Sequence, residues 1–354
     1  MKDLLDVSGL KRDGPSTLLV QFLRKFADEV FGNGGAVADA DWPWLEDVFT
    51  TIDLAANTGH HLGRSYSAAD LRTVRRCFLI RMIRMLEIRY RREAKSAGPR
   101  WEALQTLYRT VNFETSVFLS MNWDTVVEDA LWRERGVRRF DYRCGAKPVV
   151  IDDLGTVQLN TRPKGSSTAY VLKPHGSINW MYFDSCRQVF WFQPRYSERI
   201  ADRLFKSTDA DRIERLTGNR PKIRTLQGFC PSCQVNALST RFATFSFKKA
   251  LDFPMYGSTW REAENKLRSA QNWIFFGYSM PSADYEFKYM LKSSYLGRSD
   301  RPRIILITGG EDATSTVQNY RRYFGRDSIK NEDIFTDGLE VNGLSRLKTT
   351  GILQ

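Results

Sequence analysis

The nine residues Trp273-Ile-Phe-Phe-Gly-Tyr-Ser-Met-Pro281 contain the pattern that decides the fold. A short apolar run that ends in glycine and small polar residues is typical of a buried strand followed by a loop and a helix. Three other stretches have the same form: Ser116–Met121 before Asn122, Tyr170–Leu172 before Lys173-Pro-His-Gly-Ser177, and Arg303–Thr308 before Gly309-Gly310. Helical patterns follow such strands, so we predict an α/β fold with a Rossmann-like parallel sheet and helices on both faces.

The rest of the chain is expected to complete a single domain around this sheet. Two stretches, Leu18–Phe31 and Ala68–Glu93, carry apolar residues spaced three to four apart, as helices do. We therefore divide the chain into a mainly helical segment, a Rossmann-like core in two parts, a small hairpin or zinc-ribbon-like insert and a C-terminal segment. The helical segment spans residues 1–112, and the core spans 113–179 and 250–325. The insert spans 180–249, and the C-terminal segment spans 326–354.

Composition excludes disorder and favours a cytoplasmic protein. Hydrophobic residues make up 42% of the 354 residues and charged residues 27%, which suits a folded soluble chain. The longest apolar runs, such as Cys77–Ile80, fall far short of the ~20 residues that span a bilayer, so no membrane contact is expected. The first residues lack the pattern of a secretory signal, and five cysteines, an odd number, favour a reducing compartment.

The charge balance favours anionic partners. With 53 basic and 41 acidic residues, the net charge is +12, which suits nucleotides, nucleic acid or an acidic protein. A basic surface that serves only solubility explains the surplus equally well. Arginines also crowd the predicted helix 68–93; they suit an acidic partner, but a solvated helix face is the favoured interpretation.

Three motifs follow the predicted strands in order, and together they suggest a family. They are Ser120-Met-Asn-Trp-Asp124, Lys173-Pro-His-Gly-Ser177 and Gly277-Tyr-Ser-Met-Pro-Ser-Ala-Asp284. In this order they resemble the sirtuin-like NAD-consuming family, in particular its bacterial branch from antiphage defence. The resemblance covers roughly residues 113–325. It implies NAD as substrate and cleavage of the nicotinamide–ribose bond.

The resemblance makes Asn122 and His175 the catalytic pair. An imidazole, with an ordinary pKa near 6.5, suits removal of a proton from a ribose hydroxyl or from water. An amide donates and accepts hydrogen bonds without adding charge, which suits orienting water beside a developing cation. Asp124 is expected to hold ribose or brace its loop. Gly277, Ser279 and Gly309 are expected to border the cofactor.

Each of these residues also has an ordinary structural interpretation. Asn122 is a common residue in a turn that closes a strand, and a histidine at a strand end is often structural. Asp284 suits a helix cap, and a tight turn explains Gly309 as well as a nucleotide does. The pair His60-His61 lies in a polar, glycine-flanked stretch that we interpret as a surface loop.

Three cysteines form part of a metal-binding pattern. Cys230-Pro-Ser-Cys233 is a CxxC pair, and Cys186 lies 44 residues earlier. Zinc ribbons of sirtuin-like proteins use two such pairs, but Phe183 stands where the fourth cysteine is expected, with Asp184 as a substitute. A structural zinc takes four ligands, so we favour a metal-free hairpin over a zinc site at Cys186, Cys230 and Cys233. Cys77 and Cys144 are interpreted as ordinary buried residues.

The N-terminal segment departs from the family pattern. The family opens with a strand and a Gly-Ala-Gly-x-Ser loop around the pyrophosphate. In this chain only Gly14-Pro15-Ser16, at the end of Val7–Ser16, matches that loop, and no apolar strand precedes it. Such a loop supplies charge-assisted hydrogen bonds to phosphate, so its loss weakens NAD binding.

We therefore expect an NAD⁺ hydrolase that acts as an effector in antiphage defence. An NAD-dependent protein deacylase that uses the same histidine is the first alternative. A catalytically silent module that binds a nucleotide or nucleic acid is the second. A protein activator or partner subunit is expected for an effector, as is a homo-oligomer.

Overall fold

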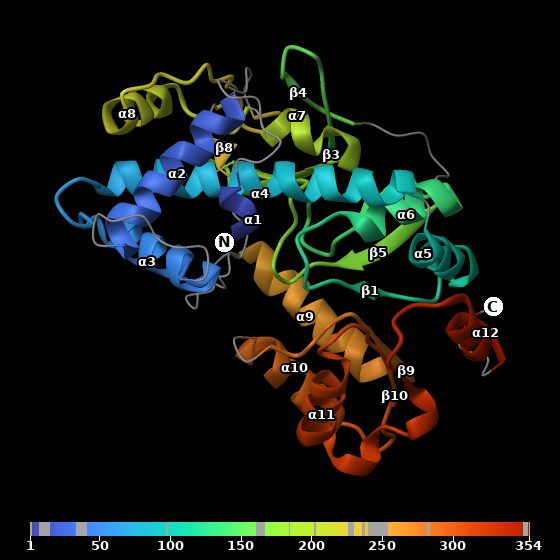
Figure 1. Cartoon of the computed structure of the whole chain (residues 1–354). Coiled ribbons are helices and arrows are strands. Elements are labelled where there is room, and N and C mark those ends of the chain that lie inside the picture. Colours follow the sequence, from blue (N-terminus) through green and yellow to red (C-terminus); the bar gives the residue numbers. More distant parts are fainter. Residues whose placement is uncertain are drawn as a thin grey trace.

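The structure, a computed structural model, is shown in Figure 1. It describes residues 2–6, 15–32, 41–96, 98–160, 167–183, 185–201, 203–225, 230–235, 238–239, 254–281, 284–349 and 353. The Val7–Gly14 part of the segment compared with the phosphate loop, and Asp184, the candidate substitute for the missing fourth cysteine, lie outside these residues.

The N-terminal part of the chain is helical, as predicted. Its helices are α1 (Lys2–Leu5), α2 (Pro15–Phe31), α3 (Leu45–Thr58), α4 (Ala68–Ser96) and α5 (Pro99–Thr110). Helix α4 is the long central one, and α2 and α3 pack along it (Figure 1). Between α3 and α4, His60 and His61 are exposed in a loop, which confirms that interpretation.

Arg75, Arg76 and Arg81 of α4 bind neighbouring elements, so the prediction of a solvated face is wrong for them, whereas Arg89, Arg91 and Arg92 are exposed as predicted. Arg75 pairs with Asp53 of α3 at 2.7 Å, and the buried Arg81 donates to the carbonyl of Leu4 at 2.9 Å. Arg76 pairs with the buried Asp209. A guanidinium carries five donors, so one arginine can satisfy both a carboxylate and backbone carbonyls.

Two three-stranded parallel sheets stand where one was expected. The first has the order β1 (Phe118–Leu119), β5 (Thr168–Leu172), β2 (Arg139–Asp141); the second has the order β11 (Ile334–Phe335), β10 (Arg303–Ile307), β9 (Asn272–Phe276). Helix α6 (Val126–Arg135) follows β1. Helices α9 (Pro254–Ser269), α10 (Tyr285–Leu296), α11 (Ala313–Phe324) and α12 (Val341–Thr349) precede, connect or follow the strands of the second sheet, and α9 also contacts β5.

A third sheet, of mixed direction, forms the insert. Its order is β4 (Val157–Leu159), β3 (Lys147–Ile151), β7 (Gln188–Phe192), β6 (Trp180–Phe183), β8 (Leu238–Ser239). Helix α7 (Ser197–Ala201) follows β7 and contacts α4, and helix α8 (Ser207–Thr217) contacts α2 and α4. Strands β3 and β4 precede residue 180, so this sheet begins inside the segment expected to be core.

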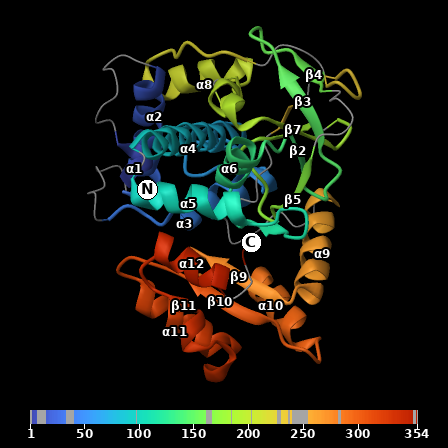
Figure 2. The ribbon, with the colours of Figure 1, turned by 90° about the vertical axis from the view of Figure 1, so that its right-hand side faces the viewer.

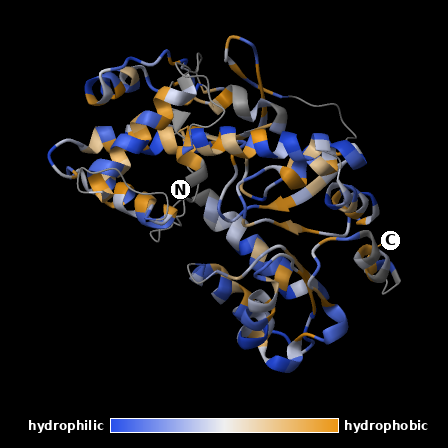
Figure 3. Ribbon diagram, in the orientation of Figure 1, coloured by the Kyte–Doolittle hydropathy of each residue, from blue (hydrophilic) through white to orange (hydrophobic). Residues whose placement is uncertain are grey.

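Apolar packing joins these parts into one molecule. Buried residues of the N-terminal helices share a cluster with the mixed sheet, through Phe78 and Phe190 for example. Alternate residues of β10 belong to two clusters: Leu306 packs with Phe287 of α10, and Ile305 packs with Ala103 of α5. Figures 2 and 3 show the second parallel sheet with its helices on one side of the molecule, and hydrophobic residues along the strands.

Among the described helices, none combines the length and the apolar character needed to cross a membrane.

Candidate functional site

The loops that follow β1 and β5 lie at the same edge of the first sheet. The two strands run parallel with Leu119 opposite Leu172, and the N–H of Ser120 donates to the Leu172 carbonyl at 2.9 Å. Asn122 and His175 each lie three residues beyond this paired position. Parallel pairing therefore brings both predicted catalytic residues to the carboxyl ends of adjacent strands, where α/β proteins bind ligands. The Asn122 residue is exposed there.

Lys173 links these two loops from the inside. Its side chain is fully buried, and its Nζ donates to the carbonyl oxygen of Asp124 and lies 3.4 Å from Oε1 of Glu128. A second link joins backbones, because the N–H of Ile178 donates to the Trp123 carbonyl at 2.9 Å. Buried groups therefore fix the position of one loop relative to the other.

Glu128 extends this link into a buried polar network. Burial raises the pKa of Glu128, and the nearby Lys173 ammonium opposes that rise. The Tyr142 hydroxyl donates to Oε1 of Glu128 at 3.1 Å, and Asn179 Nδ2 donates to the Tyr142 hydroxyl oxygen at 3.1 Å. All four side chains are buried. Separating the two loops would leave a buried charge without its partner, which costs free energy. The network therefore fixes the arrangement of the loops.

Asp124 braces the first loop. Its Oδ1 accepts the N–H of Val126 at 3.0 Å, where α6 begins. This is one of the two roles predicted for the residue.

His175 lies in a tight turn between β5 and β6. The N–H of Gly176 donates to the Lys173 carbonyl at 2.9 Å, and Gly176 has a φ of 83°, a conformation that glycine adopts without strain. Trp260 of α9 donates from Nε1 to the Pro174 carbonyl at 3.1 Å, and its ring centroid lies 6.3 Å from that of His175. The His175 side chain is 12% exposed. The imidazole is therefore held between elements of the fold and remains partly accessible.

Asp284 brings the third motif to His175. Its Oδ1 lies 4.0 Å from Nε2 of His175, and its Oδ2 accepts the Tyr278 hydroxyl at 3.0 Å. Burial raises the pKa of Tyr278, and Asp284 raises it further, so the phenol stays a neutral donor. Asp284 occupies the N-cap position of α10, as expected, but its side chain makes no cap hydrogen bond.

The predicted cofactor-binding residues of the second sheet lie at the ends of β9 and β10. Gly277 has a φ of 63°, its N–H donates to the Ile307 carbonyl at 3.0 Å, and a Cβ added there would contact nothing within 4 Å. Ser279 is exposed beside it. The backbone at Gly277 is therefore open to close approach by a ligand.

Gly309 has a packing reason to be glycine. A Cβ at this position would lie 2.9 Å from the backbone nitrogen of Gly338, which itself donates to the Thr308 carbonyl at 2.8 Å. This close contact of two backbones explains the residue without a nucleotide. A role for Gly309 in cofactor binding stays a prediction.

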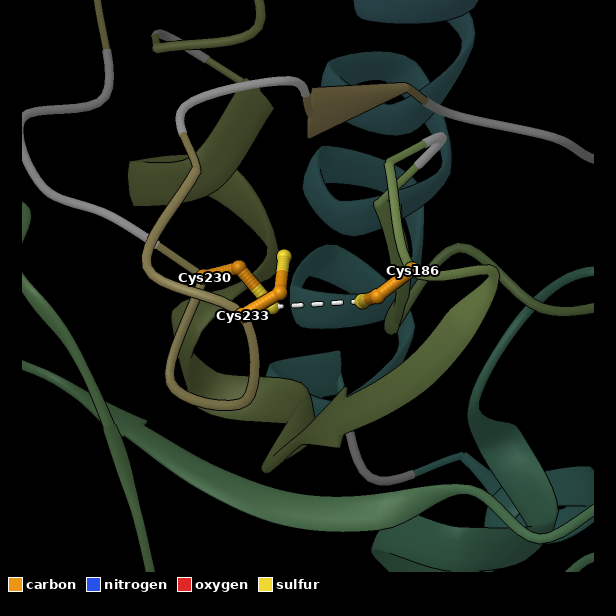
Figure 4. A group of neighbouring side chains, drawn as sticks. All are labelled: Cys186, Cys230 and Cys233. Atoms are coloured by element: carbon orange, nitrogen blue, oxygen red, sulfur yellow. Dashed lines mark hydrogen bonds between the residues drawn. The ribbon is translucent and has the colours of Figure 1, made fainter.

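The three predicted metal ligands lie together, as Figure 4 shows. The sulfur atoms of Cys186, Cys230 and Cys233 all lie within 4.8 Å of one another, and those of Cys186 and Cys230 are 3.5 Å apart. Cys186 comes from the turn between β6 and β7. A hydrogen bond with Ser185 Oγ, at 3.1 Å, and a backbone N–H lower the pKa of Cys233 to about 7.

This geometry fits three of the four ligands of a zinc ion. Sulfur atoms around a tetrahedral zinc lie about 3.8 Å apart when each Zn–S bond is ~2.3 Å. Three clustered thiols, one of which ionises near neutral pH, could hold such a metal. The fourth predicted position, Asp184, lies outside the described residues. Cys77 is buried as predicted, and Cys144 is partly buried.

In comparisons of the sequence with known proteins, no family model and no curated protein matches the chain. The resemblance to sirtuin-like proteins therefore rests on its motifs.

Sequence reasoning missed two residues of the candidate site. The motif alone does not single out Lys173, which carries the link between the loops. Aspartate before a helix ordinarily caps it, so the sequence favours a cap at Asp284 over a contact with His175. A lysine that follows a buried strand directly is one signal that could have been used, since a charge in that position needs a buried partner.

Proposed function

We propose that this chain is a sirtuin-like NAD⁺ hydrolase that cleaves the nicotinamide–ribose bond. The observation that supports the proposal is the meeting of the three motifs on which the resemblance rests. The loops at Asn122 and His175 share one sheet edge, and Asp284, from the motif that follows β9, lies 4.0 Å from His175. Residues far apart in the sequence thus converge where a dinucleotide would bind.

The arrangement of the sheets is consistent with a Rossmann-like core. The segments that follow β5 and β9 meet where Asp284 lies 4.0 Å from His175, so strands of both parallel sheets end near this region, and such ends collect ligands in α/β folds. Helices pack on both faces of β10 through alternate residues. Exposed backbone at Gly277 would approach the ribose or the pyrophosphate.

In the proposed reaction His175 is the general base. It takes a proton from a ribose hydroxyl or from the attacking water, and the water oxygen then bonds to the anomeric carbon as nicotinamide leaves. Asn122 orients that water through its amide. Because the transition state resembles an oxocarbenium ion, a neutral amide suits this place better than a cation does.

The test is the loss of NAD⁺ and the appearance of nicotinamide and ADP-ribose with purified protein, with and without a candidate activator. We expect His175→Ala and Asn122→Ala to lower the rate by roughly 10²-fold or more, the range of general acid–base contributions. His60→Ala is the matched control, because His60 is an exposed loop histidine. Equal rates in the wild-type protein and both site variants would contradict the proposal.

The alternatives give different results in the same set of measurements. A protein deacylase consumes NAD⁺ one-to-one with an acyl-peptide and depends on that peptide. A silent nucleic-acid module gives no heat with NAD⁺ or ADP-ribose in titration calorimetry and binds oligonucleotides with a steep salt dependence. The role as an antiphage effector belongs to this proposal through the family resemblance alone.

A further inference from the structure

Asp284 stands where aspartate usually caps a helix, but its side chain has another use. It occupies the N-cap of α10 and makes no cap hydrogen bond with the helix backbone. Its Oδ2 accepts the Tyr278 hydroxyl, and its Oδ1 lies 4.0 Å from Nε2 of His175. One oxygen is therefore held by the loop and the other faces the imidazole.

The loop that carries Tyr278 is itself fixed. The Tyr278 carbonyl accepts the Tyr320 hydroxyl at 2.9 Å, and its ring packs edge-on against Phe287 with centroids 5.3 Å apart. Met280, in the same loop, is buried and has a φ of 58°, a backbone conformation that residues other than glycine adopt only when their surroundings hold them there. These contacts set the direction of the Asp284 carboxylate.

We propose that Asp284 is the positioning residue of His175. At 4.0 Å its carboxylate makes no hydrogen bond with the buried Nε2, but its negative charge faces that atom and favours the proton there, so that Nδ1 is the basic nitrogen of the neutral ring. When Nδ1 takes a proton from the ribose hydroxyl or water, the Asp284 charge stabilises the imidazolium, and Asp284 itself stays ionised. Hydrogen bonds of this kind are often long without substrate and shorten when it binds.

The tautomer of His175 tests this proposal without any enzymatic activity. The chain has three histidines, and two of them are exposed, so nitrogen-15 NMR of histidine-labelled protein resolves them, with His175→Ala as the assignment control. We expect the proton on Nε2 in the wild-type protein and a changed tautomer in Asp284→Asn. Asp300→Asn, at a carboxylate whose side chain is 85% exposed, should leave the signal unchanged. Identical His175 signals in the wild-type protein and Asp284→Asn would overturn the proposal.

The kinetic consequence rests on the proposed function. We expect Asp284→Asn to lower kcat for NAD⁺ cleavage on the order of 10²-fold with little change in KM, because a misdirected base affects the transition state more than substrate binding. Asp284→Glu should recover part of that loss, and Tyr278→Phe should cost less than Asp284→Asn. A changed tautomer with unchanged kcat would overturn the positioning role. A protein that cleaves no NAD⁺ but shows the tautomer change would contradict the proposed function alone.

Discussion

Cys230 is buried, whereas Cys186 and Cys233 are partly exposed, and this difference decides how a metal would reach them. A zinc ion can enter from the side of the two accessible thiols and reach the buried one last. The lowered pKa of Cys233 favours it as the first ligand, because the thiolate is the form that binds metal.

We therefore expect the reduced protein to bind one zinc ion at these three residues. Replacing Cys186 by serine should weaken zinc binding by at least about tenfold, since a hydroxyl is a poor substitute for a thiolate. The measurement is zinc content by mass spectrometry after dialysis against chelators of graded strength. Cys144→Ser is the control, because Cys144 lies outside the cluster. Equal zinc contents in the wild-type protein and the Cys186→Ser variant would exclude the site.

At the scale of elements, helices α4 and α8 are joined by a buried carboxylate. Asp209, in the first turn of α8, accepts hydrogen bonds from Thr73 at 2.7 Å, from Arg76 Nε at 2.9 Å and from the Lys206 N–H at 2.7 Å. Burial alone would raise the pKa of Asp209, but the hydrogen bonds and the charge of Arg76 outweigh burial and lower it. An ion pair between Arg76 and Asp209, which lie 133 residues apart in the sequence, thus holds the two helices together.

Asp209→Asn is expected to destabilise the fold by about 1.5–3 kcal/mol at pH 7, the range for a hydrogen bond to a charged group. A carboxyl whose folded pKa lies below its unfolded value stabilises the protein above the unfolded value, and the contribution disappears as the pH falls through the folded pKa. The difference between variant and wild type should therefore shrink below about pH 4. Urea unfolding at several pH values measures it. A difference that does not depend on pH would show that Asp209 acts through packing rather than charge.

The elements that the sequence predicts best are those with strong apolar patterns. Strand β10 packs against helices on both faces, and β9 is buried on the face of Trp273 and Phe275. Both strands are apolar runs, and their expected bounds differ from the observed ones by one residue. Strands β2 and β4 have three residues each and contain exposed positions, so they exist because a partner strand is present. Strand β3 contains Pro148, a residue that disfavours strands, and its carbonyl accepts the Asn160 N–H.

The candidate site was predictable only in part, because some of its contacts depend on residues from other elements rather than on a pattern within one element. Parallel pairing places Asn122 and His175 at one edge, which strand order and motif position suffice to suggest. The contact between Asp284 and His175 depends on Tyr278 competing successfully with the backbone of α10 for the carboxylate. No pattern within a single element carries that information.

At the scale of the whole molecule, the candidate site draws on both parallel sheets. The loops at residues 122–125 and 173–178 belong to the first sheet, and the loop that starts at Gly277 belongs to the second. Between the sheets, Leu172 of β5 packs in the same cluster as Trp273 of β9. A ligand that contacts all three loops would therefore hold the two sheets together.

Hydrogen exchange with ADP-ribose tests this expectation directly. ADP-ribose that bridges the sheets should slow amide exchange in all three loops at once and leave the exposed loop at His60 unchanged. At a free ligand concentration 100 times its dissociation constant, ADP-ribose should also raise the free energy of unfolding by about 2.7 kcal/mol. This increase is measured as a shift in the urea midpoint. AMP, which lacks the second phosphate and the terminal ribose of ADP-ribose, should protect fewer loops. Protection confined to the loops of one sheet would mean that the three motifs do not form a single site, however close Asp284 lies to His175.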